Sequence, residues 1–189
     1  MLFDWLARRQ MAAFEDKFHY DMSYGRELLG WSGKAFWRFS RLAGLANYRE
    51  GVPLSTWYAA KVVGARSEDC GPCVQLVVDM ARSEGVADAV LRAVLEDKVA
   101  MMDADAALGY HYARAVVEHG GEVLALRDEV LRRFGPRGMA SLVLALTASR
   151  MYPLFKYAMG HGHACVRVRV GSETVSPIMM NNPAHALRA

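Results

Sequence analysis

Three features of the chain predict an all-α fold. Apolar residues recur at helical spacing over most of its length, capping residues and Gly/Pro pairs divide that pattern, and alternation of period two occurs only near the C-terminus. The alternating residues are Val166, Val168 and Val170, so we expect one short extended strand there. The 189 residues are enough for one domain with a real core.

The helical spacing defines each expected helix in turn. Leu2, Leu6, Phe14 and Phe18 would share one face of a first helix over residues 2–21. The later helices are expected over residues 34–46, 55–66, 70–84, from Asp88, and over 105–119, 122–134 and 137–158.

Capping and breaking residues place the helix ends. Ser55, Asp69 and Asp88 are the expected N-caps, because their short polar side chains can accept a hydrogen bond from the first turn. The Gly135-Pro136 pair should end one helix, and Pro153 should kink the next, since proline lacks the amide donor. These breaks divide the chain into an N-terminal helical extension (1–50), a helical core (51–160) and a C-terminal strand and tail (161–189).

Charge and hydropathy exclude several classes of partner. The net charge is +3 with no dense Lys/Arg cluster, so no nucleic-acid partner is expected. The longest apolar run, residues 139–146, falls far short of the roughly 20 residues that a membrane span needs. Asp4 near the start is unlike a secretory leader, and an odd number of cysteines fits a reducing compartment. We therefore expect a cytoplasmic protein with no membrane partner.

The most informative motif is Cys70-Gly71-Pro72-Cys73. Two thiols three residues apart at the start of a helix share a face, where they can form a disulfide or share a metal ion. The preceding segment is helical in pattern, whereas a thioredoxin motif follows a strand, so thioredoxin itself is not expected. The helix N-terminus favours a thiolate, and on this argument Cys70 would be the more exposed and more reactive thiol. Glu68 and Asp69 act in the opposite direction, because a neighbouring carboxylate disfavours a thiolate.

In this setting the chain resembles the alkylhydroperoxidase D and carboxymuconolactone decarboxylase superfamily. The resemblance rests on a helix leading by a short turn into CxxC and on the order of the later helices, over about residues 50–160. It implies a helical homo-oligomer without a resident cofactor, in which Cys70 and Cys73 reduce peroxides with electrons from a thiol–disulfide donor. Family position makes Cys73 the attacking thiol, while the helix argument above favours Cys70. The decarboxylase members generally lack CxxC, which disfavours their lyase activity here.

Two positions differ from the redox-active members of that family. Where those members have a glutamate and a histidine that relay protons, this chain has Tyr58 and Val77. A valine cannot take a proton, and a tyrosine is a poor base at neutral pH. Candidate helpers are Tyr58 itself and Lys61, with His111 or His119 as alternative bases. The missing relay also leaves open a degenerate member of the family, an oligomeric scaffold or binding protein without turnover.

A zinc site is a further alternative. His161, His163 and Cys165 lie within five residues, and with Cys70 and Cys73 they could complete a tetrahedral Cys3His set. The two halves of this set lie about ninety residues apart, and the histidines could equally contact the last carbonyls of a helix.

Overall fold

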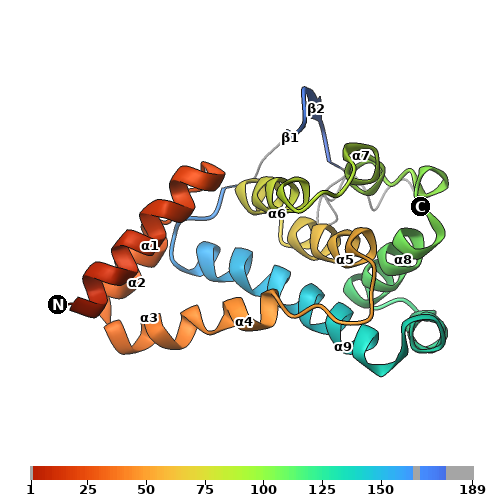
Figure 1. Ribbon diagram of the computed structural model, residues 1–189, viewed down its shortest axis with the longest axis horizontal. Helices are drawn as coiled ribbons and strands as arrows, with labels where there is room; N and C mark the ends of the chain where they lie inside the picture. Colours follow the sequence, from red (N-terminus) through yellow and green to blue (C-terminus); the bar gives the residue numbers. More distant parts are fainter. Residues whose placement is uncertain (1, 164–166, 178–189) are drawn as a thin grey trace.

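The computed structural model describes residues 2–163 and 167–177, and Figure 1 shows an arrangement dominated by helices. The elements in chain order are α1 (Leu2–Phe18), α2 (Ser23–Trp31), α3 (Gly33–Ser40), α4 (Leu42–Ala46), α5 (Leu54–Ser67), α6 (Gly71–Ser83), α7 (Asp88–Leu95), the 3-10 helix η1 (Val99–Met101), α8 (Ala104–Glu118), α9 (Val123–Ala158), β1 (Val168–Val170) and β2 (Glu173–Val175). The predicted all-α fold is confirmed.

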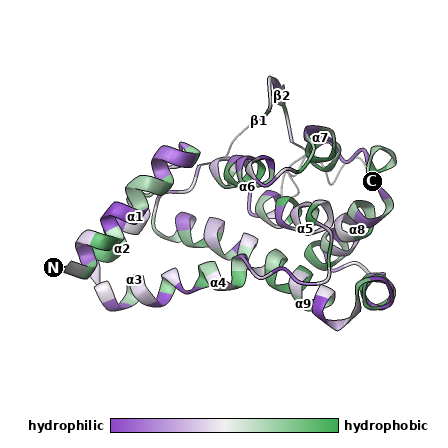
Figure 2. Ribbon diagram, in the orientation of Figure 1, coloured by the Kyte–Doolittle hydropathy of each residue, from purple (hydrophilic) through white to green (hydrophobic). Residues whose placement is uncertain are grey.

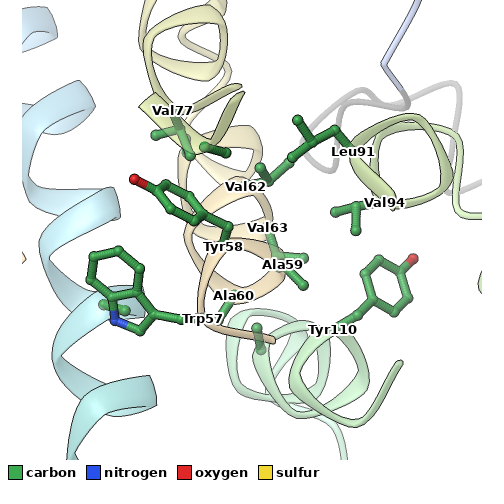
Figure 3. Packing of buried hydrophobic residues seen from close by; sticks show 14 of the residues in the cluster. Trp57, Tyr58, Ala59, Ala60, Val62, Val63, Val77, Leu91, Val94 and Tyr110 are labelled. Carbon is green, nitrogen blue, oxygen red and sulfur yellow. The ribbon is translucent and has the colours of Figure 1, made fainter. Parts of the chain in front are cut away.

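Helix α5 is the centre of the main core. It packs against α6, α7, α8 and α9, and its residues from Thr56 to Ser67 are all buried. Val62 and Val63 lie on the side of α5 that faces Leu91, Val94 and Tyr110, while Tyr58 points toward Val77 of α6 (Figure 3). Hydrophobic residues of α7 and α8 lie next to α5 in Figure 2, as burial of these faces requires.

A glycine allows the closest helix approach in this core. A Cβ at Gly109 of α8 would lie 2.7 Å from the carbonyl oxygen of Thr56 in α5. Only a residue without a side chain fits such a crossing, so Gly109 sets how closely α5 and α8 pack.

The N-terminal helices form a cover with its own apolar cluster. Its buried residues are Ala7, Met11, Leu28, Leu29 and Phe36, and Phe155 of α9 packs against them. Aromatic rings continue the cluster toward α9, with Phe39 stacked on Phe155 at 4.0 Å between centroids. We use "cover" below for α1 to α4, which lie along one end of α9 in Figure 1.

The cover differs most from the sequence prediction. The helix α2 was not predicted, and the expected helix over 34–46 is two helices, α3 and α4. The buried residues Ala7 and Met11 of α1 were not predicted. Of the predicted face, Leu6 is 41% exposed, whereas Phe14 and Phe18 are partly buried. Of the four tryptophans only Trp57 is buried.

The predicted helix caps were also wrong. Pro53, Cys70 and Ala87 are the N-cap residues of α5, α6 and α7, in place of Ser55, Asp69 and Asp88. Asp69 instead has a positive φ of 52° and forms the turn before α6. Its left-handed conformation lets the chain reverse within three residues, which places Cys70 at the start of the helix.

The breaks and the C-terminal segment agree better with the predictions. Two helical segments of α9 meet at Gly135, whose φ of 67° and ψ of −177° interrupt the helix as expected, whereas Pro153 keeps helical φ and ψ. Of the predicted strand, Val168 and Val170 lie in β1, and Val166 lies outside the described residues. β1 pairs antiparallel with β2, which was not expected. Val168, Val170 and Val175 of this hairpin join the main core.

No helix in the described part of the chain is both long and apolar enough to cross a membrane.

Candidate functional site

The two cysteines of the CxxC motif form a disulfide at the start of α6. Cys70 is the N-cap residue and Cys73 the third residue of this helix, so both lie at the positive end of its dipole. Cys70 is fully buried and Cys73 is 4% exposed. The expectation that Cys70 is the more exposed thiol is therefore wrong, because the turn at Asp69 directs the N-cap side chain into the core.

Cys73 lies in the wall of a cavity between the cover and the core. The cavity has a volume of about 370 Å³. Its walls are mainly aromatic, Met and Ala side chains from α1 to α6 and α9. Gln10, Ala43 and Asn47 line it and are exposed, so it reaches the surface there. Cys70 does not line the cavity.

Tyr20 is the cover's contact with the disulfide. Its hydroxyl lies 3.7 Å from the Sγ atom of Cys73, and because that sulfur carries no hydrogen in the disulfide, the hydroxyl is the donor. Burial raises the pKa of Tyr20 well above its ordinary value, so the phenol keeps its proton. The buried Lys156 ammonium lies 4.5 Å from the centre of the Tyr20 ring and holds the ring by a cation–π contact. No motif or spacing in the sequence pointed to Tyr20, which lies in the short link between α1 and α2.

Lys61, one of the two predicted helpers, lines the same cavity wall as Cys73. Its side chain is buried, its Nζ atom donates a hydrogen bond to the carbonyl oxygen of Ala46 at 3.2 Å, and it lies 4.0 Å from the Trp57 ring centre. Burial lowers the pKa of Lys61 to about 8, against its usual value near 10.5. At neutral pH the amine is still mostly protonated, and an ammonium cannot act as a base.

Tyr58, the other predicted helper, does not line the cavity. It lies in the main core beside Val77 (Figure 3). Its hydroxyl donates to Oε1 of Glu84 at 2.7 Å. Burial and the Glu84 carboxylate raise the pKa of Tyr58, so it keeps its proton at neutral pH. Val77, at the position where the redox-active members of the family have the relay histidine, lines the cavity wall. The alternative bases His111 and His119 are exposed, on α8 and at its end.

Of the two acidic residues before Cys70, Glu68 is held by an ion pair. The Nε atom of Arg150 donates to Glu68 at 2.7 Å, which balances that carboxylate. Tyr157 donates to the backbone oxygen of Asp69, and this contact fixes the turn against α9.

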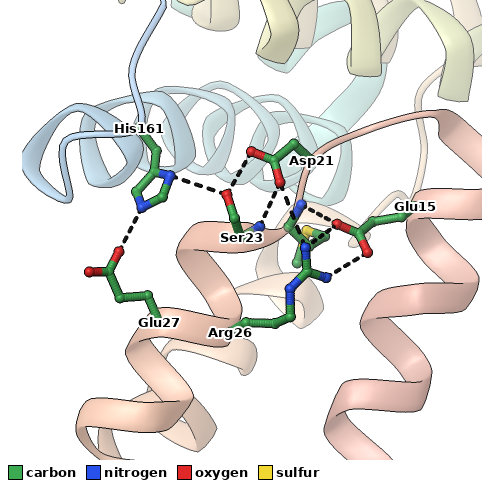
Figure 4. A network of polar contacts seen from close by, with 7 residues as sticks. Glu15, Asp21, Ser23, Arg26, Glu27 and His161 are labelled. Atoms are coloured by element: carbon green, nitrogen blue, oxygen red, sulfur yellow. Dashed lines mark hydrogen bonds and ion pairs between the residues drawn. The ribbon is translucent and has the colours of Figure 1, made fainter.

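The residues of the predicted zinc set do not come together within the described chain. Both ring nitrogens of His161 are engaged by α2, with Glu27 at 2.6 Å and Ser23 at 3.1 Å (Figure 4). His163 is exposed, and its carbonyl oxygen accepts from the amide of Gly71. Among residues 2–163 and 167–177 no three His, Cys, Asp or Glu side chains are placed to hold one metal ion, and Cys165 lies outside the described residues.

The contacts of His161 serve the cover instead. Figure 4 shows His161 at the end of α9 bonded to α2, next to a second group in which Arg26 pairs with Glu15 of α1 at 2.6 Å. Together these contacts tie α1, α2 and the segment after α9 to one another.

Comparison of the chain with family models, with curated proteins and with solved structures finds no match.

Proposed function

We propose that this protein is a CxxC thiol–disulfide oxidoreductase that reduces organic peroxides, with Cys73 as the attacking thiol and Cys70 as the resolving thiol. The observation that carries the proposal is the position of Cys73, whose side chain lines a cavity that reaches the surface while Cys70 is buried behind it. The relationship to alkylhydroperoxidase D, the homo-oligomer and the cytoplasmic location belong to this proposal.

The proposed cycle consumes one peroxide and two thiols. The Cys73 thiolate attacks the outer peroxide oxygen, the O–O bond breaks, and the alkoxide leaves as an alcohol after taking a proton from solvent. The Cys70 thiol then attacks the Cys73 sulfenic acid, water leaves and the disulfide forms. A small dithiol that enters the cavity returns two electrons by exchange with the disulfide.

Three contacts support Cys73 as the attacking thiol. Its place in the first turn of α6 sets it at the positive end of the helix dipole, which favours a thiolate. The Tyr20 hydroxyl is already in place to donate a hydrogen bond to that sulfur. Apolar walls around it suit an organic peroxide better than a charged substrate.

Peroxide reduction tests the proposal directly. With cumene hydroperoxide and dithiothreitol, we expect turnover in the wild type and none in Cys73→Ser. Cys70→Ser should form one sulfenic acid per chain, trapped by dimedone and located at Cys73 by mass spectrometry. If dimedone labels Cys70 in the reverse variant, Cys73→Ser, then Cys70 is the attacking thiol and Cys73 the resolving thiol.

The alternative function is a binding protein that has kept the fold and the thiols without turnover. It is favoured by the cavity lining, which in the described chain includes no His, Asp or Glu that could relay a proton. Absence of peroxide reduction by a protein whose disulfide is fully reduced would select this alternative.

Tyr20→Phe tests the hydrogen bond to Cys73 separately from turnover. Loss of a hydrogen bond to a charged sulfur costs about 1.5 kcal/mol, so the pH midpoint for alkylation of Cys73 should rise by about one unit. Tyr152→Phe is the matched control, because Tyr152 lines the same cavity without a recorded bond to sulfur. Equal midpoints in the two variants would remove Tyr20 from the proposal.

A further inference from the structure

Lys61 is a charged residue of the cavity wall that the proposed cycle does not use. Among the described residues that line the cavity, it is the only one that is charged at neutral pH. The side chain is 4% exposed, and no described carboxylate lies within ion-pair distance of it. The Lys61 ammonium lies over the rings of Trp57 and Tyr58, 4.0 and 5.0 Å from their centres, which offsets part of the cost of burying its charge. An ammonium has three N–H donors. One is used by the Ala46 carbonyl oxygen, which leaves capacity for an anion.

We propose that the cavity binds a linear monocarboxylate of about ten carbons, an amphiphile with its carboxylate at the Lys61 ammonium and its hydrocarbon chain along the apolar walls. This inference goes beyond the proposed function, because it concerns ligand binding and requires no thiol chemistry.

The size of the cavity sets the length of the ligand. Because a cavity of roughly 150 Å³ accepts a benzene ring, a volume of about 370 Å³ has room for on the order of a dozen non-hydrogen atoms. Met11, Met22 and Met80 are among the lining side chains, and their unbranched thioethers adapt to a flexible chain.

The positions of the polar groups set the direction of the ligand. Lys61 contacts Ala46, which adjoins the exposed Asn47 at the rim, so the carboxylate would lie near the entrance. The chain would then extend inward along α5 past Ala65, which lines the cavity one helical turn further on. Cys73 and Tyr20 also line this cavity and face the apolar part of the ligand.

The second buried lysine does not compete for the carboxylate. Lys156 is 2% exposed and is not among the residues that line the cavity. Both lysines lie over aromatic rings, so what separates them is that Lys61, of the two, lines the cavity. The head of the ligand is therefore assigned to Lys61 alone.

Calorimetric titration of the full-length protein with decanoate at neutral pH, below its micelle concentration, tests the proposal. Decanol and decyltrimethylammonium carry the same chain with a neutral and a cationic head. Because a charge-assisted hydrogen bond contributes at least about 1.5 kcal/mol, decanoate should bind the wild type at least about tenfold more tightly than either.

Variants of two lysines assign the head group. Lys61→Met keeps the apolar stem and should weaken decanoate at least about tenfold while leaving decanol unchanged. Lys98→Met is the matched control, since Lys98 is exposed and pairs with Glu96 outside the cavity. Equal affinity of the wild type for decanoate and decanol would overturn the proposal even if Lys61→Met failed to fold. Unchanged decanoate affinity in a folded Lys61→Met would do the same.

Decanoate titration and the peroxide assay together distinguish ligand binding from the proposed oxidoreductase activity. Cys73→Ser should lose peroxide reduction and keep decanoate binding. Binding without turnover in the wild type would leave the ligand site in place and select the binding-protein alternative. Turnover without preference for the carboxylate would leave the oxidoreductase and remove the ligand assignment.

Discussion

The two apolar clusters of this molecule differ in how completely they are filled. The core around α5 is closed by small and β-branched side chains, and Gly109 lets α8 approach to contact. The cover meets α5, α6 and α9 through aromatic and Met side chains and encloses a cavity of about 370 Å³. Dense packing gives a cluster its stability, whereas incomplete packing leaves room for a ligand. We infer that the α5 core stabilises the fold and that the cover shapes the site.

Two glycine-to-alanine substitutions test this difference most strongly. In the core, Gly109→Ala would place a methyl group 2.7 Å from the Thr56 carbonyl oxygen, so α5 and α8 must separate. We expect a loss of about 3 kcal/mol in the free energy of unfolding, measured by denaturant titration, at the upper end of ordinary overpacking costs. In the cover, a Cβ at Gly30 of α2 meets nothing within 4 Å. Gly30→Ala should therefore raise stability by about 0.5 kcal/mol, because alanine favours the helix.

Similar effects at the two positions would contradict the comparison. A neutral Gly109→Ala would mean that α8 can move without loss, and the core would then be no more tightly filled than the cover.

The buried charge at Lys61 gives the second largest effect, and it depends on pH. The pKa of Lys61 is about 8 in the folded protein and is near its ordinary 10.5 once the chain unfolds. Between these values the unfolded state binds more protons, so the stability of the wild type rises with pH over that window. Lys61→Met lacks this titration. From about pH 7 to about pH 10 the wild type should gain about 2 kcal/mol relative to the variant, measured as the difference in free energy of unfolding.

Lys98→Met serves again as the control, because its exposed ammonium should give a difference that stays level with pH. A level difference for Lys61→Met as well would show that Lys61 is solvated, and the cavity would then lack its buried charge.

The same comparison explains what the sequence could predict. In the core, regular apolar spacing over long segments predicted the positions of α5 to α9 nearly correctly. Gly135 interrupts α9, as the sequence predicted. In the cover, α2 contains Gly25 and Gly30 and is short, so its helical signal was weak. The buried face of α1 is formed by Ala7 and Met11, and a prediction based on large apolar residues does not include them.

The residues of the candidate site also fall into two groups, those that local sequence spacing predicts and those that tertiary packing brings together. The CxxC pair and Lys61 were predictable, since local spacing along α5 and α6 places them. The contact of Tyr20 with Cys73 spans 53 residues, and it depends on how the cover docks. The histidine expected as a metal ligand, His161, bonds to Glu27, 134 residues away, for the same reason. Contacts of this kind are set by tertiary packing and cannot be predicted from the spacing of residues along the sequence.

The smallest effect tests how the cover is held. Glu27→Gln removes the charge opposite His161 and should cost only about 0.5 kcal/mol, since both side chains are partly exposed. Because the contact fixes α2 to the end of α9, the loss should appear as faster hydrogen exchange in α2 peptides, with α5 peptides unchanged. Glu118→Gln, which breaks the exposed pair with Arg114 on α8, is the matched control and should leave α2 exchange unaltered. Faster exchange in α5 as well as α2 would mean that cover and core open together, and the separate roles assigned to the two clusters would fail.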